Sequence, residues 1–472
     1  MARMCCNTPA CLSARHRLTA LLVPALWVAE ALIARPATAQ PSEKKPKSDG
    51  PRITLIRDAE TETLLRTFAN PLFRAAGVDP NLVRIIVIRD SAINSFVSTG
   101  NLMFVNTGLI MKAESALELV GVLAHETGHI AGGHLARLPD AMREAMIQSI
   151  AAMLIGAAAG AVTRGSGIGA GLGGQALAQR NFLSFTRSME RSADQAAVGL
   201  LDANRWSAAG MLDLFRHLEG QELLVSSMQD PYVQTHPLNR ERMAFVENHV
   251  SRSPYSRNPL PAGFETGFQM VKAKLAAFLA PSSVTLRSLK PGDATPPARY
   301  ARAIALYRLG HLGEALPLID GLIAEQPANP WLYELKGQML FENGRGRESL
   351  AVYREAVKLV PEQPLVRMAL AQAMVETGDP AQLRPAIQQL QMALDRERGN
   401  ADGWRALGTA WGKLGELGQA NLALAEEALV NGDIRVARGF ATKAEQQLPA
   451  GPSRLRAGDI ANAVKKENRE GF

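Results

Sequence analysis

Hydrophobic and polar residues follow two different periods along the chain, and each period predicts its own kind of element. From residue 57 the segment "RDAETETLLRTFANPLFRAAGV" repeats apolar side chains at helical spacing, which predicts an amphipathic helix. The segments "VRIIVIRD" (83–90) and "NLMFVNTGLI" (101–110) are short, rich in β-branched residues and bounded by Asn, Asp and Gly, so they predict two strands. The next long segment, from Glu118 onwards, is predicted to be a helix. The first part of the chain should therefore be mostly α with one small sheet.

The C-terminal part of the chain repeats itself. The segments "LYRLGHLGEAL", "LFENGRGRESL" and "AMVETGDPAQL" place Gly310, Gly344 and Gly378 at intervals of 34 residues, the period of the tetratricopeptide repeat (TPR). Gly415 follows after 37 residues, so the later copy contains an insertion. Each repeat is a helix pair that buries its apolar face only against its neighbours, so residues 298–465 are predicted to form an all-α solenoid. A non-repeating helical bundle is the alternative.

The first 39 residues differ from the rest of the chain. A basic stretch precedes "LTALLVPALWVA", an apolar run too short to span a bilayer, and "ATAQ" follows with small residues at 37 and 39. This order predicts a cleaved secretory signal (1–39) and a secreted mature protein; an uncleaved anchor is the alternative. All three cysteines lie in the signal, so the mature chain would have neither disulfides nor thiols. Residues 40–51 are predicted to be a flexible leader.

The charge of the mature chain gives no support for nucleic-acid binding. The full chain has 52 basic and 45 acidic residues; the signal contains four arginines and one glutamate, so its removal leaves 48 and 44. These charges are interspersed, which is typical of a solvated surface and not of a nucleic-acid-binding patch.

Three further segments affect the domain organisation. The alanine-rich helix at 141–162 is interrupted by charges, which favours burial in protein or contact with a membrane surface over a membrane span. The glycines at 165–174 suggest a mobile loop. Residues 251–297, rich in Pro and Ser, are predicted to be a linker with one helix between the two domains.

The segment "ELVGVLAHETGHIAGGHLARL" carries three of the eight histidines of the chain. At about 100° per residue, His125 and His129 lie about 40° apart on one helix face, so both imidazoles can reach one ion. Glu126 stands beside them in the H-E-x-x-H pattern of zinc hydrolases, where such a glutamate is the general base. The alternative is a structural helix whose histidines are satisfied by hydrogen bonds.

A zinc site needs a third protein ligand. In "FTRSMERSADQAAVGLL", Glu190 and Asp194 are four residues apart and share a helix face. Glu190 can complete a two-histidine, one-carboxylate site, while Asp194 can accept the free N–H of a ligand histidine; ordinary surface charge is the alternative. His134 follows His125 by nine residues, one short of the metzincin spacing, and is predicted to pack or cap near the helix end.

The blocks "HETGHIAGGH", "FTRSMERSAD" and "THPLNRERM", in this order, resemble the motifs of the zinc metallopeptidases related to HtpX and the CAAX prenyl protease. The resemblance covers about residues 52–250 and implies a zincin-type α+β domain. It implies zinc on His125, His129 and Glu190, and catalysis by Glu126.

The same resemblance assigns roles to residues outside this cluster. It implies that Asp194 supports the ligands and that His236 lies near the metal, where it can take the open position and hold the enzyme idle. Arg242 matches the arginine of the third motif and is expected to orient that loop or the substrate.

The segment "INSFVSTGNLMFVNTG" resembles the edge strand of the family. Asn94, Phe96 and Gly100 match its pattern, whereas Asn101 replaces a common second glycine. An exposed strand edge captures extended peptides through backbone hydrogen bonds.

These features together predict a periplasmic zinc endopeptidase. The resemblance implies that its substrates are unfolded or misassembled outer-membrane proteins, and that the repeats hold substrates or the outer-membrane assembly machinery. One alternative is a TPR chaperone or scaffold whose zinc site is silent or structural. A protease embedded in the membrane through the 141–162 helix is another.

Overall fold

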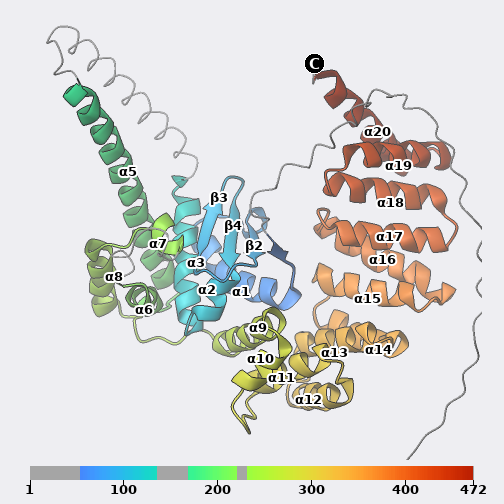
Figure 1. Cartoon of the computed structure of the whole chain (residues 1–472), viewed down its shortest axis with the longest axis horizontal. Helices are drawn as coiled ribbons and strands as arrows, with labels where there is room; N and C mark the ends of the chain where they lie inside the picture. Colours follow the sequence, from blue (N-terminus) through green and yellow to red (C-terminus); the bar gives the residue numbers. More distant parts are fainter. Residues whose placement is uncertain (1–53, 135–167, 220–230, 471–472) are drawn as a thin grey trace, which may run out of the picture. The chain divides into compact units, whose positions relative to one another are not determined.

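The computed structural model describes residues 54–134, 168–219 and 231–470 (Figure 1). The predicted fold class, a mostly α chain with one small sheet followed by helical repeats, is confirmed. The predicted signal (1–39), the leader (40–51) and the alanine-rich helix (141–162) lie outside the described residues. Within the described part of the chain, no helix combines the length and apolar composition that crossing a bilayer requires.

The sheet has four strands in the order β1-β2-β4-β3. β2 and β4 are parallel, while β1 pairs antiparallel with β2 and β3 pairs antiparallel with β4. β3 is therefore the terminal strand on its side of the sheet. The strands are β1 (Leu55–Ile56), β2 (Arg84–Ile88), β3 (Ser95–Ser98) and β4 (Leu102–Asn106).

Two local features of the sheet differ from the sequence patterns. The strand predicted to reach residue 110 ends at Asn106, because Gly108 turns the chain into a helix and donates its N–H to the carbonyl of Asp90. A side chain at Gly108 would collide with the backbone of Ser91. Asn101 follows Gly100 in the β3–β4 turn with a φ of 56°, a left-handed conformation that Asn tolerates, so the missing second glycine is accommodated.

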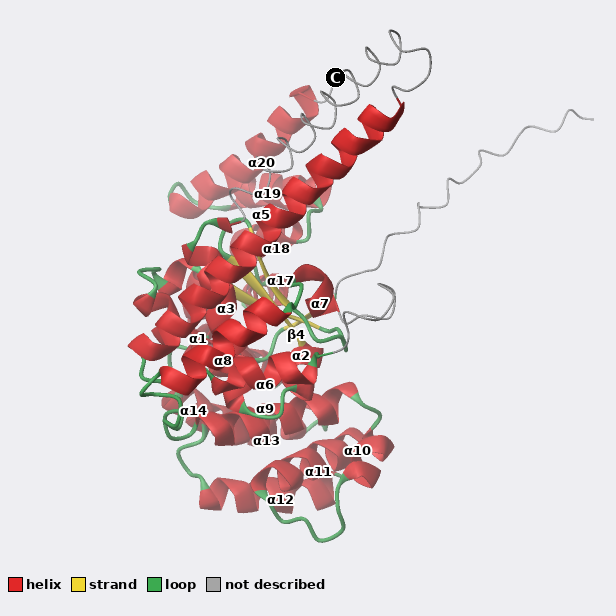
Figure 2. Cartoon of the chain, turned by 90° about the vertical axis from the view of Figure 1, so that its left-hand side faces the viewer, coloured by secondary structure: helices red, strands yellow, loops and turns green. Residues whose placement is uncertain are grey.

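α3 is the central helix of the N-terminal domain. It is buried along nearly its whole length and packs against α1, α5, α6 and β3 (Figure 2). The helices of this domain are α1 (Ala59–Ala75), the 3-10 turn η1 (Pro80–Leu82), α2 (Thr107–Lys112), α3 (Ala116–Ala131), α5 (Ile168–Ala203), α6 (Ala209–His217), α7 (Pro231–Thr235) and α8 (Arg240–Arg252).

α5 corrects the prediction of a mobile glycine loop, because residues 168–174 already belong to this helix. Each glycine costs about 1 kcal/mol relative to alanine in a helix. Helix propagation is cooperative, however, and the C-terminal half of α5 is anchored on α3, so the helix extends back through the glycines.

The segment between the domains holds two helices, α9 (Phe264–Leu279) and α10 (Ser282–Ser288), where one was predicted. α10 has only seven residues and no apolar period that would reveal it. α9 gives Phe268 and Leu275 to the core of the N-terminal domain, and Met270 and Ala277 to the core of the first repeat. It is thus a packed element shared by two cores.

The repeats stack as helix pairs, drawn from yellow through orange to red in Figure 1. Gly310, Gly344, Gly378 and Gly415 each stand in a turn between two helices with positive φ. The helices are α11 (Pro296–Arg308), α12 (Leu312–Glu325), α13 (Pro330–Glu342), α14 (Gly346–Leu359), α15 (Pro364–Glu376), α16 (Pro380–Arg396), α17 (Ala401–Lys413), α18 (Leu417–Val430), α19 (Ile434–Gln447) and α20 (Pro452–Glu470). α16 has 17 residues where α12 and α14 have 14, which accounts for the interval of 37.

A buried ionic cluster joins α1 and α9 to the first repeats. Lys274 is 3% exposed and lies 2.5 Å from Asp58, 3.3 Å from Glu60 and 3.4 Å from Glu334. The Tyr300 hydroxyl donates to Glu60 at 2.9 Å. Burial raises the pKa of Glu60 to about 7. The neighbouring carboxylates Asp58 and Glu334 add to this effect, and the single ammonium of Lys274 offsets it only in part.

Candidate metal centre

Two histidines of α3 point their Nε2 atoms at one spot. The helix begins at the cap Ser115, whose hydroxyl accepts the N–H of Glu118, and runs without interruption to Ala131. His125 and His129 are both buried, and their Nε2 atoms are 3.1 Å apart. The four-residue spacing thus places both imidazoles on one face, inside the domain.

α5 brings Glu190 against both imidazoles. Its Oε2 lies 3.3 Å from Nε2 of His125, and its Oε1 lies 3.3 Å from Nε2 of His129. Burial alone would raise the pKa of Glu190, but hydrogen bonds from the histidines hold it well below its ordinary value. The carboxylate is therefore charged and aimed at the imidazoles.

His236, in the loop after α7, completes the cluster. Its Nδ1 lies 3.2 Å from both oxygens of Glu190 and 3.3 Å from Nε2 of His125. Its Nε2 lies 3.1 Å from the carbonyl oxygen of Ser95 on β3. This loop therefore connects the cluster to the terminal strand of the sheet.

The spacing of these donor atoms fits a tetrahedral metal ion. Bonds of about 2.0–2.1 Å to a tetrahedral ion set its donors about 3.3 Å apart. The neighbouring donor atoms of His125, His129, Glu190 and His236 are separated by 3.1–3.3 Å, and the ligand atoms of all four residues lie within 4.8 Å of one another. A cation shared by these buried nitrogen and carboxylate donors would offset the carboxylate charge, so the group fits a metal site.

The two histidines of α3 differ in protonation. Burial lowers the pKa of His129 to about 3, so its imidazole is neutral, the form that binds metals. Burial also disfavours the charged form of His125, but Asp194 and Glu190 outweigh it and raise the pKa of His125 to about 9. A metal ion at His125 therefore has to replace a proton on its ring.

Asp194 orients His125, and Arg242 holds Asp194. Nδ1 of His125 lies 2.9 Å from Oδ1 of Asp194. The guanidinium of Arg242 donates to both oxygens of Asp194, at 2.6 and 2.9 Å, and lies 3.0 Å from Glu190. Burial alone would raise the pKa of Asp194, but these hydrogen bonds hold it below its usual value. Arg242 also donates to the carbonyl of Pro237 at 2.9 Å, so it fixes the loop that carries His236.

Glu126 is fully buried beside the donor atoms, and within the described residues its carboxylate oxygens have no hydrogen-bond partner. The nearest ring nitrogen, Nε2 of His236, is 3.5 Å away. Burial raises the pKa of Glu126. Such a carboxylate is available to accept a proton from a molecule bound in the cluster.

The predicted edge-strand residues lie in different places. Asn94 reaches the site region, where its Oδ1 accepts a hydrogen bond from the Thr235 hydroxyl at 3.3 Å. Phe96 stacks on Phe104 across the strand pair, and Gly100 stands in the β3–β4 turn, so neither joins the donor cluster.

His134 is buried and packs near the helix end, as predicted, but the sequence did not reveal its contact with His129. Its Nδ1 lies 3.0 Å from Nδ1 of His129, so it contacts a residue of the donor cluster. The two glycines in front of His134 were the signal that the helix stops and the chain turns back.

Substituting Arg242 with leucine should destabilise the N-terminal domain strongly, because Asp194 and Glu190 would stay buried without their guanidinium. Breaking such a buried pair costs about 3–5 kcal/mol of unfolding free energy. The matched control is Arg191→Leu on α5, whose exposed pair with Glu241 should contribute at most about 1 kcal/mol. Urea unfolding followed by tryptophan fluorescence measures both; equal, small losses would contradict the expected role of Arg242.

Comparison with known proteins agrees with this architecture. Residues 58–250 match peptidase family M48, and residues 300–364 and 335–382 match a tetratricopeptide repeat. The β-barrel assembly-enhancing protease of Yersinia pestis is 25% identical over 405 residues, 84% of this chain and 82% of that protein. The protease of the same name from Escherichia coli K12 is 24% identical over 373 residues, 77% of this chain and 74% of that protein. Among solved structures, a thermophilic TPR protein of Thermus thermophilus is 23% identical and covers 35% of this chain and 98% of its own, with a TM-score of 0.24.

The match to peptidase family M48 contains the whole donor cluster and Glu126, and the TPR match falls on the helix pairs that begin with α11. The chain is thus a metalloprotease that joins an M48 peptidase domain to C-terminal tetratricopeptide repeats.

Proposed function

We propose that the N-terminal domain is a zinc endopeptidase that cuts extended, unfolded polypeptides. The observation that carries this proposal is the buried carboxylate of Glu126, which accepts no hydrogen bond from the described residues and lies next to donors spaced for one tetrahedral ion. His125, His129 and Glu190 would hold the ion, and this set of nitrogen and carboxylate donors suits Zn²⁺. When bound, Zn²⁺ supplies a Lewis acid that polarises the scissile carbonyl and makes water more acidic.

The residues of the chain handle the proton. Glu126 takes a proton from the attacking water and passes it to the leaving amine. Burial raises its pKa above the ordinary carboxyl value, which makes it a stronger proton acceptor than an exposed glutamate. Asp194 accepts the Nδ1–H of His125 and keeps its Nε2 turned to the metal, with Arg242 holding the carboxylate in place.

The terminal strand β3 is the proposed substrate-binding edge. The carbonyls of Ile93 and Ser95 point away from β4 and accept from the N–H of Tyr232 and from His236. The backbone N–H and C=O groups of successive residues point to opposite edges of a strand. Val97, two residues after Ser95, therefore presents its backbone groups on the same outer edge. An extended substrate that pairs there would bind through its main chain, whatever its sequence.

His236 is proposed to block this site until substrate arrives. With His236 in place the cluster offers four protein donors, the number of a closed structural site, whereas a catalytic site keeps one position open. His236 also hydrogen-bonds to the carbonyl oxygen of Ser95 on the proposed edge, where a substrate N–H would have to bind. A peptide that pairs with β3 and reaches the metal must therefore displace His236 from both places.

The client proteins and the compartment are proposed from the relatives. Two of them are named β-barrel assembly-enhancing proteases, so we propose that this protease acts on misassembled outer-membrane β-barrel proteins. The predicted secretory signal at 1–39 supports action in the periplasm.

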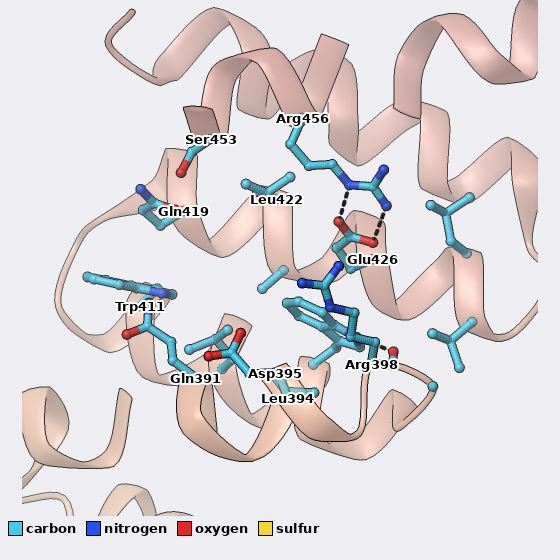
Figure 3. Close-up of a pocket in the computed structure, with 16 residues that line it drawn as sticks. Gln391, Leu394, Asp395, Arg398, Trp411, Gln419, Leu422, Glu426, Ser453 and Arg456 are labelled. Atoms are coloured by element: carbon cyan, nitrogen blue, oxygen red, sulfur yellow. Dashed lines mark hydrogen bonds and ion pairs between the residues drawn. The ribbon is translucent and has the colours of Figure 1, made fainter. Parts of the chain in front are cut away.

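The repeats are proposed to bind the unfolded client in a cavity of about 640 Å³ formed by the end of α16 with α17, α18 and α20 (Figure 3). Trp411 and Leu422 give this cavity half-buried apolar surface. Glu426 is held by Arg456 on one side, while Asp395 and Arg398 have no ion pair among the described residues. Apolar walls with free charges of both signs suit an extended polypeptide that carries a large apolar side chain.

Glu126→Gln should abolish cleavage of casein while zinc stays bound, because the amide cannot take a proton from water and the ligands are intact. Glu190→Ala should lose both zinc and activity, because a donor is removed. Metal content and casein cleavage of the purified full chain measure these effects. A zinc-loaded wild type that cleaves no unfolded substrate would instead support the scaffold alternative.

His236→Ala should keep zinc on its three other ligands and raise casein cleavage. An increase on the order of tenfold corresponds to a closed form favoured by about 1.4 kcal/mol. His249→Ala, in the same domain but outside the cluster, should leave the rate unchanged. Slower cleavage by His236→Ala would show that this histidine assists the reaction and does not block it.

Trp411→Ala should weaken binding of an unfolded polypeptide to the repeats by tenfold or more, as expected when a central aromatic residue is removed. The measurement is fluorescence anisotropy of labelled, reduced casein with the Glu126→Gln background, so that cleavage does not interfere. Leu417→Ala removes another exposed apolar side chain outside the cavity and is the matched control. Equal affinities for the two variants would rule out this cavity as the binding surface.

A further inference from the structure

His134 contacts the metal centre from the side opposite to the donor atoms. It is buried, with 4% of its surface exposed, and its Nδ1 lies 3.0 Å from Nδ1 of His129. The two rings meet edge to face, with centroids 5.0 Å apart and an interplanar angle of 84°. The contact therefore involves the ring nitrogen of His129 that does not face the donor cluster.

The chain between the two histidines is built for this contact. α3 ends at Ala131, and Gly133 adopts a φ of +60°, a left-handed conformation that turns the chain back. A Cβ on Gly132 would lie 2.4 Å from Nε2 of His134 and would clash with the imidazole ring. The missing side chain of Gly132 thus leaves space for the imidazole of His134, and the positive φ of Gly133 turns the chain toward His129.

The ring chemistry determines which nitrogen donates. A neutral imidazole carries one proton, and a metal on Nε2 of His129 places that proton on Nδ1. His129 then donates from Nδ1 to the lone pair of Nδ1 of His134. His134 must accept with a neutral ring, whose own proton is on Nε2.

We propose that His134 is a positioning residue of the metal centre: it fixes the orientation and tautomer of His129, as Asp194 does for His125. This inference rests on the proposed metal site. Ligand histidines nearly always donate their second N–H to such a partner, most often a carboxylate or a carbonyl.

A neutral partner suits the charge balance of this centre. Glu190 and Asp194 are already two buried carboxylates, and Arg242 pairs with both of them. Glu126 is a further buried carboxylate of this site, so a carboxylate at position 134 would add one more, with no cation beside it among the described residues, which is costly. An imidazole provides the acceptor without the charge.

The test compares zinc affinity of the full chain in competition with a chromophoric chelator. His134→Ala removes the acceptor and should weaken zinc binding by about 10- to 100-fold. His134→Asn places an oxygen where Nδ1 was and should recover most of that loss. Gly132→Ala, which pushes the ring away without changing its chemistry, should weaken zinc binding like His134→Ala.

The controls separate positioning from folding and from the metal site itself. His311→Ala, an exposed histidine of the repeats, should bind zinc like wild type. Thermal unfolding of each variant without zinc should match the wild type to within a few degrees. The proposed role would be overturned if His134→Ala bound zinc as tightly as wild type. It would also be overturned if His134→Asn bound zinc as weakly as His134→Ala. Neither result would argue against the zinc site itself. A wild type that binds no zinc would overturn the metal site and this inference together.

Discussion

The metal centre depends on how closely α3 and α5 approach each other at Gly128. A Cβ at this position would lie 2.7 Å from the carbonyl oxygen of Ala193 and 3.2 Å from the side chain of Ala196. Glycine on one helix and alanines on the other let the backbones touch. Glu190 lies one turn before Ala193 and can therefore reach imidazoles on a different helix. A larger residue at 128 would move the third donor away by the width of a side chain.

Charge balance is the second constraint, and one short segment contributes to it. The loop and helix from 236 to 242 bring both the fourth donor, His236, and the cation that pairs with two buried carboxylates, Arg242. Arg242 also binds the loop carbonyls. Arg242 and the proposed movable donor, His236, therefore belong to the same piece of chain, so a release of His236 would have to start from a loop that Arg242 anchors.

The sequence predicted those features that depend on local spacing. The common face of His125 and His129, the common face of Glu190 and Asp194, and the repeats at intervals of 34 all follow from helical geometry or period. It failed where distant contacts decide the local structure. The backbone of Ser91 against Gly108 converts a predicted strand end into helix, and packing on α3 carries α5 back through its glycines. The contact of His134 with His129 was not predicted, because helical spacing does not hold past Ala131, where the chain turns.

The irregular interval in the repeats gives the solenoid a surface feature that its regular part lacks. Equal repeats produce equal surfaces, so a uniform solenoid would offer a ligand several equivalent grooves. Three extra residues lengthen α16 by about 4.5 Å, and its end, with Gln391, Leu394 and Asp395, forms a wall of the cavity that also holds Trp411. A small insertion thus breaks the translational symmetry of the array. The surface at this repeat differs from the surfaces of the other repeats, so a ligand can bind there selectively.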